Sequence, residues 1–260
     1  MFDENSVRAL LLALFAGLST LIGALSILFI SGRSKSFISL ALGFAAGVMI
    51  SAAFTDLFPE SEELLNGFFG EGRGIVISVL CLICGIVIAA AMDKLLPHSH
   101  GGHDDLDDSH NLMRVGTATA IAIALHNLPE GIAIYMAGYE STTLGVTIAL
   151  AVSLHNLPGG ISIASPIYYA SGSKKTALKY AFLAGMAEPL GALIACLLLR
   201  PFINDAVIGV MFGIVAGILL YIGFEELLPA ARRQSHNNRE LIALFAGICF
   251  MPLTHIFHAH

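Results

Sequence analysis

The chain has 260 residues, of which 56% are hydrophobic and only 12% are charged. Apolar runs of about 20 residues recur along its length, which excludes a soluble domain and indicates a polytopic helical membrane protein. The formal net charge is −6 and the sequence has no basic tract, so nothing in it supports nucleic-acid binding. The four cysteines all lie within apolar runs and predict no disulfide framework.

Eight membrane spans are predicted from the apolar runs, in a single transmembrane domain that covers residues 1–260. Their approximate limits are 7–30, 38–58, 74–97, 113–137, 143–168, 176–199, 203–228 and 240–258. The connections are short except for residues 98–112, so the expected fold is an all-α membrane protein, a bundle of eight helical spans.

The distribution of lysine and arginine predicts the orientation of this bundle. With the N-terminus outside, the inner loops and span ends hold ten basic residues and the outer side holds three. The inner set is Arg33, Lys35, Lys94, Arg114, Lys174, Lys175, Lys179, Arg232, Arg233 and Arg239, and the outer set is Arg8, Arg73 and Arg200. Under the positive-inside rule, both termini lie outside the cytoplasm, in a multi-pass protein of the cell (inner) membrane.

One phrase occurs twice, in the fourth and the fifth span. Residues 123–132 read IALHNLPEGI, and 29 residues later 152–161 read VSLHNLPGGI. Each copy puts a histidine, an asparagine and a proline in the middle of an apolar run, at a depth where a charged group costs roughly 2.5 to 3.5 kcal/mol. The repetition therefore favours a site for polar cargo, which we interpret as a metal ion.

The spacing within the first copy suits a metal. His126 and Glu130 are four residues apart and Asn127 and Glu130 are three apart, so on a helix all three share one face. Imidazole, carboxylate and amide oxygen together suit zinc and its neighbours. Pro129 frees the carbonyl of Leu125 and bends the helix, which is tolerable at membrane depth where the helix lines a cavity. A packed, hydrogen-bonded histidine is the structural alternative.

Both copies are predicted to meet a third acidic residue at the membrane midplane. The fourth and fifth spans run in opposite directions, which brings His126 to Glu130 and His155 to Gly159 to the same depth as Glu188 of the sixth span. A phrase repeated in opposite directions is typical of an inverted repeat. The three spans before this pair and the three after it are expected to complete the inverted repeat, although we see no match between their sequences.

Further polar stretches lie at the predicted membrane edges. The second span ends outside in an acidic stretch whose deepest residue, Asp56, is an entrance candidate, with a solvated loop as the alternative. Segment 98–112 is rich in glycine, histidine and aspartate, which predicts a flexible cytoplasmic loop that binds metals weakly. Glu225 and Glu226 end the seventh span inside, either as metal ligands or as an interfacial cap.

The doubled phrase resembles the fourth- and fifth-span signatures of the ZIP (Zrt/Irt-like) family of divalent-metal transporters, in its bacterial zinc-transporter-like subgroup. Residues 187–191, AEPLG, resemble the family's sixth-span acidic motif, and 98–112 resemble its cytoplasmic histidine-rich loop. The likeness extends over nearly the whole chain. It implies a transporter that imports divalent cations, with zinc first and iron, manganese, cobalt and cadmium as further candidates. The metal is cargo, and no catalytic cofactor is implied.

The resemblance also implies the ligands. One ion would be held by His126, Glu130 and His155, and a neighbouring position would use Asn127, Glu130, Asn156 and Glu188. An inner exit site would comprise Asp93, His98 and His100, joined by Glu225 and Glu226.

The chain departs from the family pattern at two positions. Gly159 stands where the family usually has glutamate, and Glu225 stands where it often has histidine. The central cavity then holds two carboxylates rather than three, and like charges ~4 Å apart repel strongly in a low dielectric. We therefore expect one well-occupied ion and a weak or absent second one.

Two other functions share these residues. An intramembrane zinc hydrolase would need a catalytic zinc motif, and the sequence contains no His-Glu-x-x-His. A passive channel would use every residue named, and only saturable, slow flux distinguishes a carrier from it. The expected partners are divalent metal ions and the lipid bilayer, with a homodimer as an open alternative to a single copy.

Overall fold

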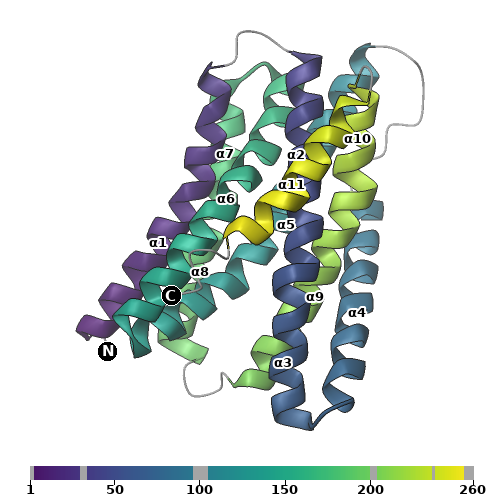
Figure 1. Ribbon diagram of the computed structural model, residues 1–260. Coiled ribbons are helices and arrows are strands. Elements are labelled where there is room, and N and C mark those ends of the chain that lie inside the picture. The colour runs from purple at the N-terminus through teal and green to yellow at the C-terminus, as the bar shows by residue number, and fades with distance from the viewer. Residues whose placement is uncertain (1–2, 30–33, 96–104, 200–203, 236–237, 255–260) are drawn as a thin grey trace.

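The computed structural model describes residues 3–29, 34–95, 105–199, 204–235 and 238–254. In these ranges the chain forms helices joined by short turns, without any strand, and the helices pack as one bundle (Figure 1). The elements are α1 Glu4–Ala24, η1 Leu25–Phe29, α2 Lys35–Ala52, η2 Ala53–Leu57, α3 Phe58–Phe69, α4 Arg73–Leu95, α5 Asp105–Glu140, α6 Thr142–Ser171, α7 Lys174–Gly185, α8 Ala187–Ile194, η3 Ala195–Leu199, α9 Asp205–Tyr221, η4 Ile222–Leu227, α10 Leu228–Arg233 and α11 Arg239–Thr254.

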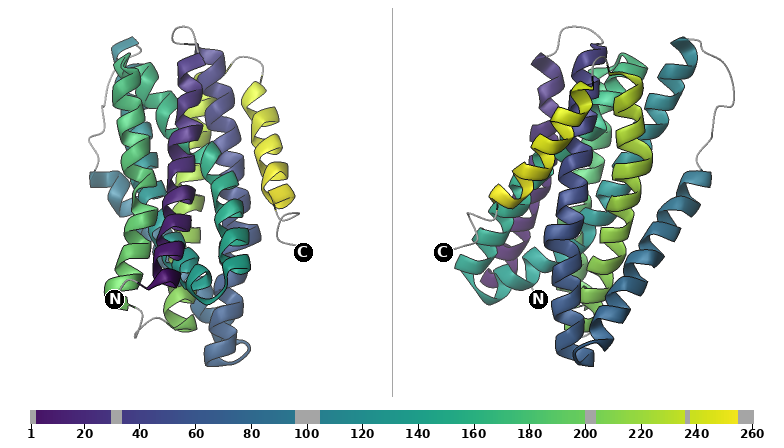
Figure 2. Two further views of the ribbon diagram at one scale, coloured as in Figure 1. Left: turned by 90° about the vertical axis from the view of Figure 1, so that its left-hand side faces the viewer. Right: turned by 45° about the vertical axis from the view of Figure 1, so that its right-hand side comes forward.

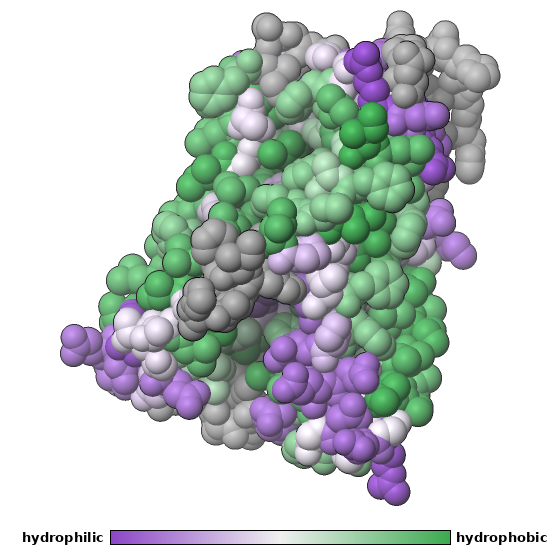
Figure 3. Space-filling view, in the orientation of Figure 1, coloured by the Kyte–Doolittle hydropathy of each residue, from purple (hydrophilic) through white to green (hydrophobic). Residues whose placement is uncertain are grey.

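Seven helical stretches of the described residues are long and apolar enough to cross a membrane. They are Glu4–Phe29, Lys35–Phe69, Arg73–Lys94, Ser109–Glu140, Thr142–Ser171, Lys174–Leu197 and Asp205–Arg233. The eighth expected span corresponds to α11, which packs along α2 and has 16 residues in the described range. On the face shown in Figure 3, hydrophobic residues cover most of the middle and polar ones gather mainly towards the two ends. The prediction of an all-α membrane bundle is confirmed.

Two segments are helical where a loop was either the prediction or the alternative. The acidic stretch after the second span continues as η2 and α3, so Asp56 and Glu60 lie on a helix. Helix α5 begins at Asp105, so residues 105–112 extend that helix instead of forming the second half of a loop. Residues 98–104 lie outside the described ranges.

A one-residue connection places the two copies of the phrase side by side. Ser141 separates α5 from α6 and caps α6 by accepting a hydrogen bond from the backbone N–H of Leu144 (3.4 Å). Because so short a link reverses the chain, α5 and α6 form an antiparallel hairpin with extensive contact. At the other end of α6, Gly172 takes the left-handed conformation (φ 68°) that terminates the helix.

The inverted repeat extends beyond this hairpin to its neighbouring helices. Gly131 of α5 lies against the backbone oxygen of Glu188 in α8, and the equivalent Gly160 of α6 lies against that of Thr20 in α1. A Cβ atom at either glycine would collide with that oxygen, so both contacts require glycine. The contacts make α1 the counterpart of the α7–α8 span.

The outer pairs of helices repeat in the same way. Gly217 of α9 packs on the backbone oxygen of Leu82 in α4, and Gly47 of α2 packs on that of Leu244 in α11. Both α2 and α9 continue into a π-helical turn, η2 and η4, and each turn is followed by a proline at the start of the next helix. The spans expected to complete the repeat therefore do so.

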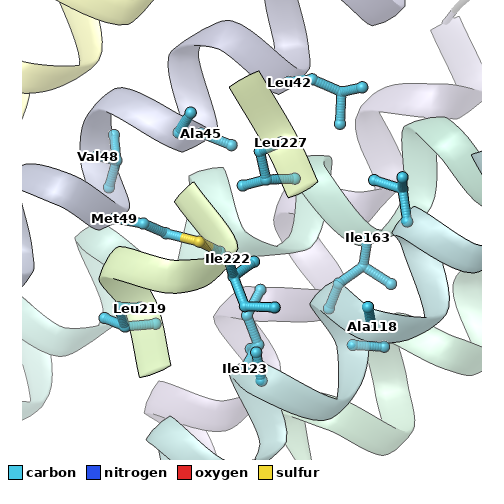
Figure 4. Packing of buried hydrophobic residues seen from close by; sticks show 14 of the residues in the cluster. Leu42, Ala45, Val48, Met49, Ala118, Ile123, Ile163, Leu219, Ile222 and Leu227 are labelled. Carbon is cyan, nitrogen blue, oxygen red and sulfur yellow. The ribbon is translucent and has the colours of Figure 1, made fainter. Parts of the chain in front are cut away.

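The helices pack as two sets, each of which contains helices from both halves of the repeat. Helices α1, α5, α6, α7 and α8 pack on one another around the doubled phrase, while α2 packs on α11 and α4 packs on α9. The second set borders the first through α2 and α9, whose residues join α5 and α6 in one apolar cluster (Figure 4). Helix α4 lies at the edge, where it contacts α3 and α9 (Figure 2).

Candidate metal-transport site

The first copy of the phrase buries its three candidate ligands on α5. His126 and Glu130 are each 6% exposed and Asn127 is fully buried. His126 Nε2 lies 3.2 Å from Glu130 Oε1, one helical turn away, as the spacing predicted. Asn127 turns its amide to the neighbouring span, where Nδ2 donates to the backbone oxygen of Ala184 (3.3 Å).

The second copy repeats this arrangement on α6 with a different partner. Asn156 Nδ2 donates to the backbone oxygen of Ala16 (3.3 Å), the α1 counterpart of Ala184. The same amide also donates to Glu188 Oε2 of α8 (2.8 Å). Asn156 and Glu188 are 3% and 0% exposed. The backbone of His155 lies in α6, and its side chain falls outside what the structure describes.

Glu130 and Glu188 are both buried and lie on α5 and α8, two helices that pack on each other. Within the described part of the chain, Glu188 Oε1 and Asn127 Oδ1 have no hydrogen-bond partner. Buried acceptors are normally satisfied, and buried charges are normally paired. A cation between the two carboxylates would meet both needs, so the donor set fits a divalent metal.

A small cavity adjoins the two phrases. It measures about 30 Å³, the volume of about one water molecule, and its polar lining is His126 and Asn156. Gly159 also lines it, and a Cβ atom there would lie 3.3 Å from Ile123 Cδ1. The position where the family usually has glutamate therefore faces this cavity.

The described side chains alone do not form a complete metal site. No group of three or more His, Cys, Asp or Glu side chains within the described ranges is close enough to hold an ion. The structure brings together the pair His126–Glu130 and the pair Asn156–Glu188. His155 stays a predicted ligand.

At the end predicted to face the cytoplasm, the structure brings together two of the predicted exit residues. Asp93 of α4 and Glu226 of η4 both accept hydrogen bonds from Arg114 Nη1 of α5, the second at 3.1 Å. Glu225 is exposed on the surface. His98 and His100 lie outside the described residues.

Two residues of these sites were missed by the sequence analysis. Thr20 is fully buried on α1 at the counterpart position of Glu188, and its hydroxyl has no hydrogen-bond partner among the described residues. Arg114 was counted only as an inner positive charge. Alignment of residues 43–59 with 213–229 would have revealed the outer repeat, because the two stretches share glycines at matching positions and Phe54 and Pro59 match Phe224 and Pro229.

A bundle of membrane-length helices with imidazole, amide and carboxylate groups buried at its centre defines a membrane transporter for cations. Comparison with known proteins agrees with this class. The family described as "ZIP Zinc transporter" matches residues 97–254.

Relatives cover nearly the whole chain. The zinc transporter ZupT of Oceanobacillus iheyensis is 41% identical over an alignment of 262 positions that covers 96% of this chain and 98% of the relative. The ZupT proteins of Streptococcus mutans and Chlorobium phaeovibrioides are 41% and 44% identical, over 97% and 95% of this chain and 98% and 96% of their own. The chain belongs to the ZIP zinc transporter family. These relatives are named as transporters and not as enzymes, so no finding supports the hydrolase alternative.

Proposed function

We propose that the protein imports zinc into the cytoplasm through the site between α5, α6 and α8. The observation that carries the proposal is the buried polar constellation itself, in which His126 meets Glu130 and Asn156 meets Glu188 in the middle of the bundle. Taking two carboxylates out of water is costly unless a positive charge compensates them. A divalent ion supplies that charge, and the imidazoles of His126 and His155 favour zinc among divalent ions.

One zinc ion at a time is the proposed occupancy. His126, Glu130 and His155 hold it, while Asn127, Asn156 and Glu188 complete the wall of the site. Glu130 and Glu188 together balance one dication, and Gly159 offers no third carboxylate for a second. The adjoining cavity of about 30 Å³ supports a carrier rather than a wide aqueous channel.

The route runs from an outer end at Asp56 to an inner end at Asp93 and Glu226. The basic residues of the spans support this orientation. Lys35 and Lys174 begin α2 and α7 and Arg232 lies in α10, and these helix ends lie opposite to the starts of α1 and α4, which hold Arg8 and Arg73 (Figure 1). Both termini then lie outside the cytoplasm, in the inner membrane. An inside-negative potential favours import of a dication by roughly 4.6 kcal/mol per 100 mV. His98, His100 and Glu225 extend the inner end towards the cytoplasm, and lipid covers the exposed apolar residues of α4.

Uptake of radioactive zinc by proteoliposomes tests the proposal. Glu130→Gln removes a charge from the centre and should abolish saturable uptake. Glu140→Gln, an exposed position on the same helix, is the matched control and should leave uptake unchanged. Normal uptake by the Glu130→Gln protein, or flux that rises linearly with zinc concentration in the parent, would contradict a carrier with this site.

A further inference from the structure

The central site and the inner end are connected along α5 and α9. Arg114 and His126 are 12 positions apart on α5, a distance of ~18 Å along the helix axis. The cavity of about 30 Å³ beside His126 is lined by Ile123 and Leu219. A second cavity of about 200 Å³ is lined by Ala122 and Ile218, the residues that precede these two in the chain, and by Asp93. Both cavities thus lie along α5 and α9, and consecutive residues of each helix line them.

The boundary between the cavities is closed by apolar side chains. Ile123 of α5, Leu219 of α9 and Ile222 of η4 belong to one packed cluster (Figure 4). The second cavity contains a single charged lining residue, Asp93, among the described ones, and it is otherwise apolar. An ion that leaves the central site therefore meets carboxylates again only where this cavity ends.

Those carboxylates already hold a cation. Arg114 Nη1 donates to Asp93 Oδ1 and to Glu226 Oε1, and Tyr221 Oη lies 3.4 Å from Asp93 Oδ2. The Glu226 side chain is 2% exposed and those of Asp93 and Arg114 are 17% and 16% exposed. Two acidic side chains therefore share one guanidinium at this cluster.

The ion pairs join the two sets of helices. Arg114 belongs to α5, which carries the first copy of the phrase, whereas Asp93 and Glu226 belong to α4 and η4 of the other set. The residue that the repeat places opposite Arg114, at the outer end of α6, is Thr143, which is exposed and uncharged. Of these two equivalent positions, only the one at the inner end carries a guanidinium.

We propose that Arg114 is a resident cation of the inner acidic site, which holds Asp93 and Glu226 closed across the two sets of helices until a departing divalent ion displaces it. The inference rests on the proposed function for the identity of that ion, but the closure itself is independent of transport. Removal of the guanidinium should open the second cavity to the cytoplasm.

Labelling of a cysteine in that cavity measures the opening. Ala118→Cys places a thiol in its lining, where Ala118 is 6% exposed, and a membrane-impermeant maleimide is added to the cytoplasmic face of membrane vesicles. Peptide mass spectrometry separates this thiol from Cys81, Cys84, Cys196 and Cys249. We expect Arg114→Gln to raise the labelling rate at least tenfold and Arg114→Lys, which keeps the charge, to raise it much less.

Three further variants make the result decisive. Arg114→Gln alone leaves the buried Glu226 carboxylate without its partner. The double variant Arg114→Gln with Glu226→Gln lacks that unpaired charge, and its thiol should be labelled as fast as in Arg114→Gln. Exchange of the charges, Arg114→Glu with Glu226→Arg, should restore slow labelling. Arg8→Gln is the matched control, because Arg8 makes two hydrogen bonds to the Gly138 oxygen at the outer end of α5 (3.1 and 2.8 Å) and should not change the rate.

Equal labelling with and without Arg114, or an equal rise in the Arg8→Gln protein, would overturn the proposal. Zinc uptake measured in the same vesicles separates it from the proposed function. Faster labelling in a protein whose parent does not transport zinc supports the closure and refutes zinc transport. Normal saturable zinc uptake by the parent, with a labelling rate that Arg114→Gln leaves unchanged, supports zinc transport and refutes the closure.

Discussion

Replacement of Gly159 by glutamate should convert a site for one ion into a site for two. The residue lines the cavity beside His126 and Asn156, and its Cβ would meet only Ile123 Cδ1 within 4 Å, at 3.3 Å. That contact needs a shift of a few tenths of an ångström by the end of a flexible side chain. A Cβ atom can therefore be added at this position without moving any backbone.

The expected magnitude follows from Coulomb's law. At an effective dielectric constant of 20, two unit charges 4 Å apart interact with about 4 kcal/mol, so a dication and a carboxylate attract with roughly 8 and two dications repel with roughly 16. A second ion would gain about as much from Glu130 and Glu188 as it loses to the first ion. A third carboxylate adds roughly 8 kcal/mol of attraction, of which desolvation removes several kcal/mol.

Isothermal titration of the purified protein with zinc checks this reasoning. We expect a stoichiometry of one for the parent and two for Gly159→Glu, with Gly159→Gln as a control of the same shape that keeps one. Without metal, the Gly159→Glu protein should melt at a lower temperature than the Gly159→Gln protein, because three carboxylates then repel one another. Two tight sites in the parent, or one in Gly159→Glu, would refute the charge argument.

Two further predictions concern the packing around the site. Gly131→Ala should destabilise the protein by several kcal/mol, because the new Cβ collides with the Glu188 backbone. Gly67→Ala is the control on α3, where the new Cβ meets open space, and it should stabilise the protein by about 0.5–1 kcal/mol. Thermal melting in detergent measures both variants, and similar melting temperatures would show that α5 and α8 adjust freely. Thr20→Val should raise the free energy of unfolding by roughly 1 kcal/mol, because it replaces a buried hydroxyl that lacks a partner by an isosteric apolar group. A lower stability of this variant would indicate that the hydroxyl is satisfied, for example by water.

Features that depend on neighbours in the chain were readable from the sequence. The hydrophobic runs predicted the spans, because a helix satisfies its own backbone hydrogen bonds wherever it crosses a membrane. The spacing from His126 to Glu130 predicted a shared face, and the structure has these side chains 3.2 Å apart. The sequence did not reveal that residues 105–112 prolong α5, since their glycine-, histidine- and aspartate-rich context favoured a loop.

Features that depend on pairing of distant helices needed the tertiary structure. The repeat beyond α5 and α6 is carried by a few glycines, such as Gly47 and Gly217, whose importance lies in the backbone that each one touches rather than in the letters around it. Likewise Arg114 counted only as a basic residue until Asp93 and Glu226 were both found in contact with its guanidinium. Helical periodicity is a local property that the sequence by itself determines. The choice of which faces meet is settled only when the whole bundle closes, because it depends on the shapes and charges of segments far apart in the chain.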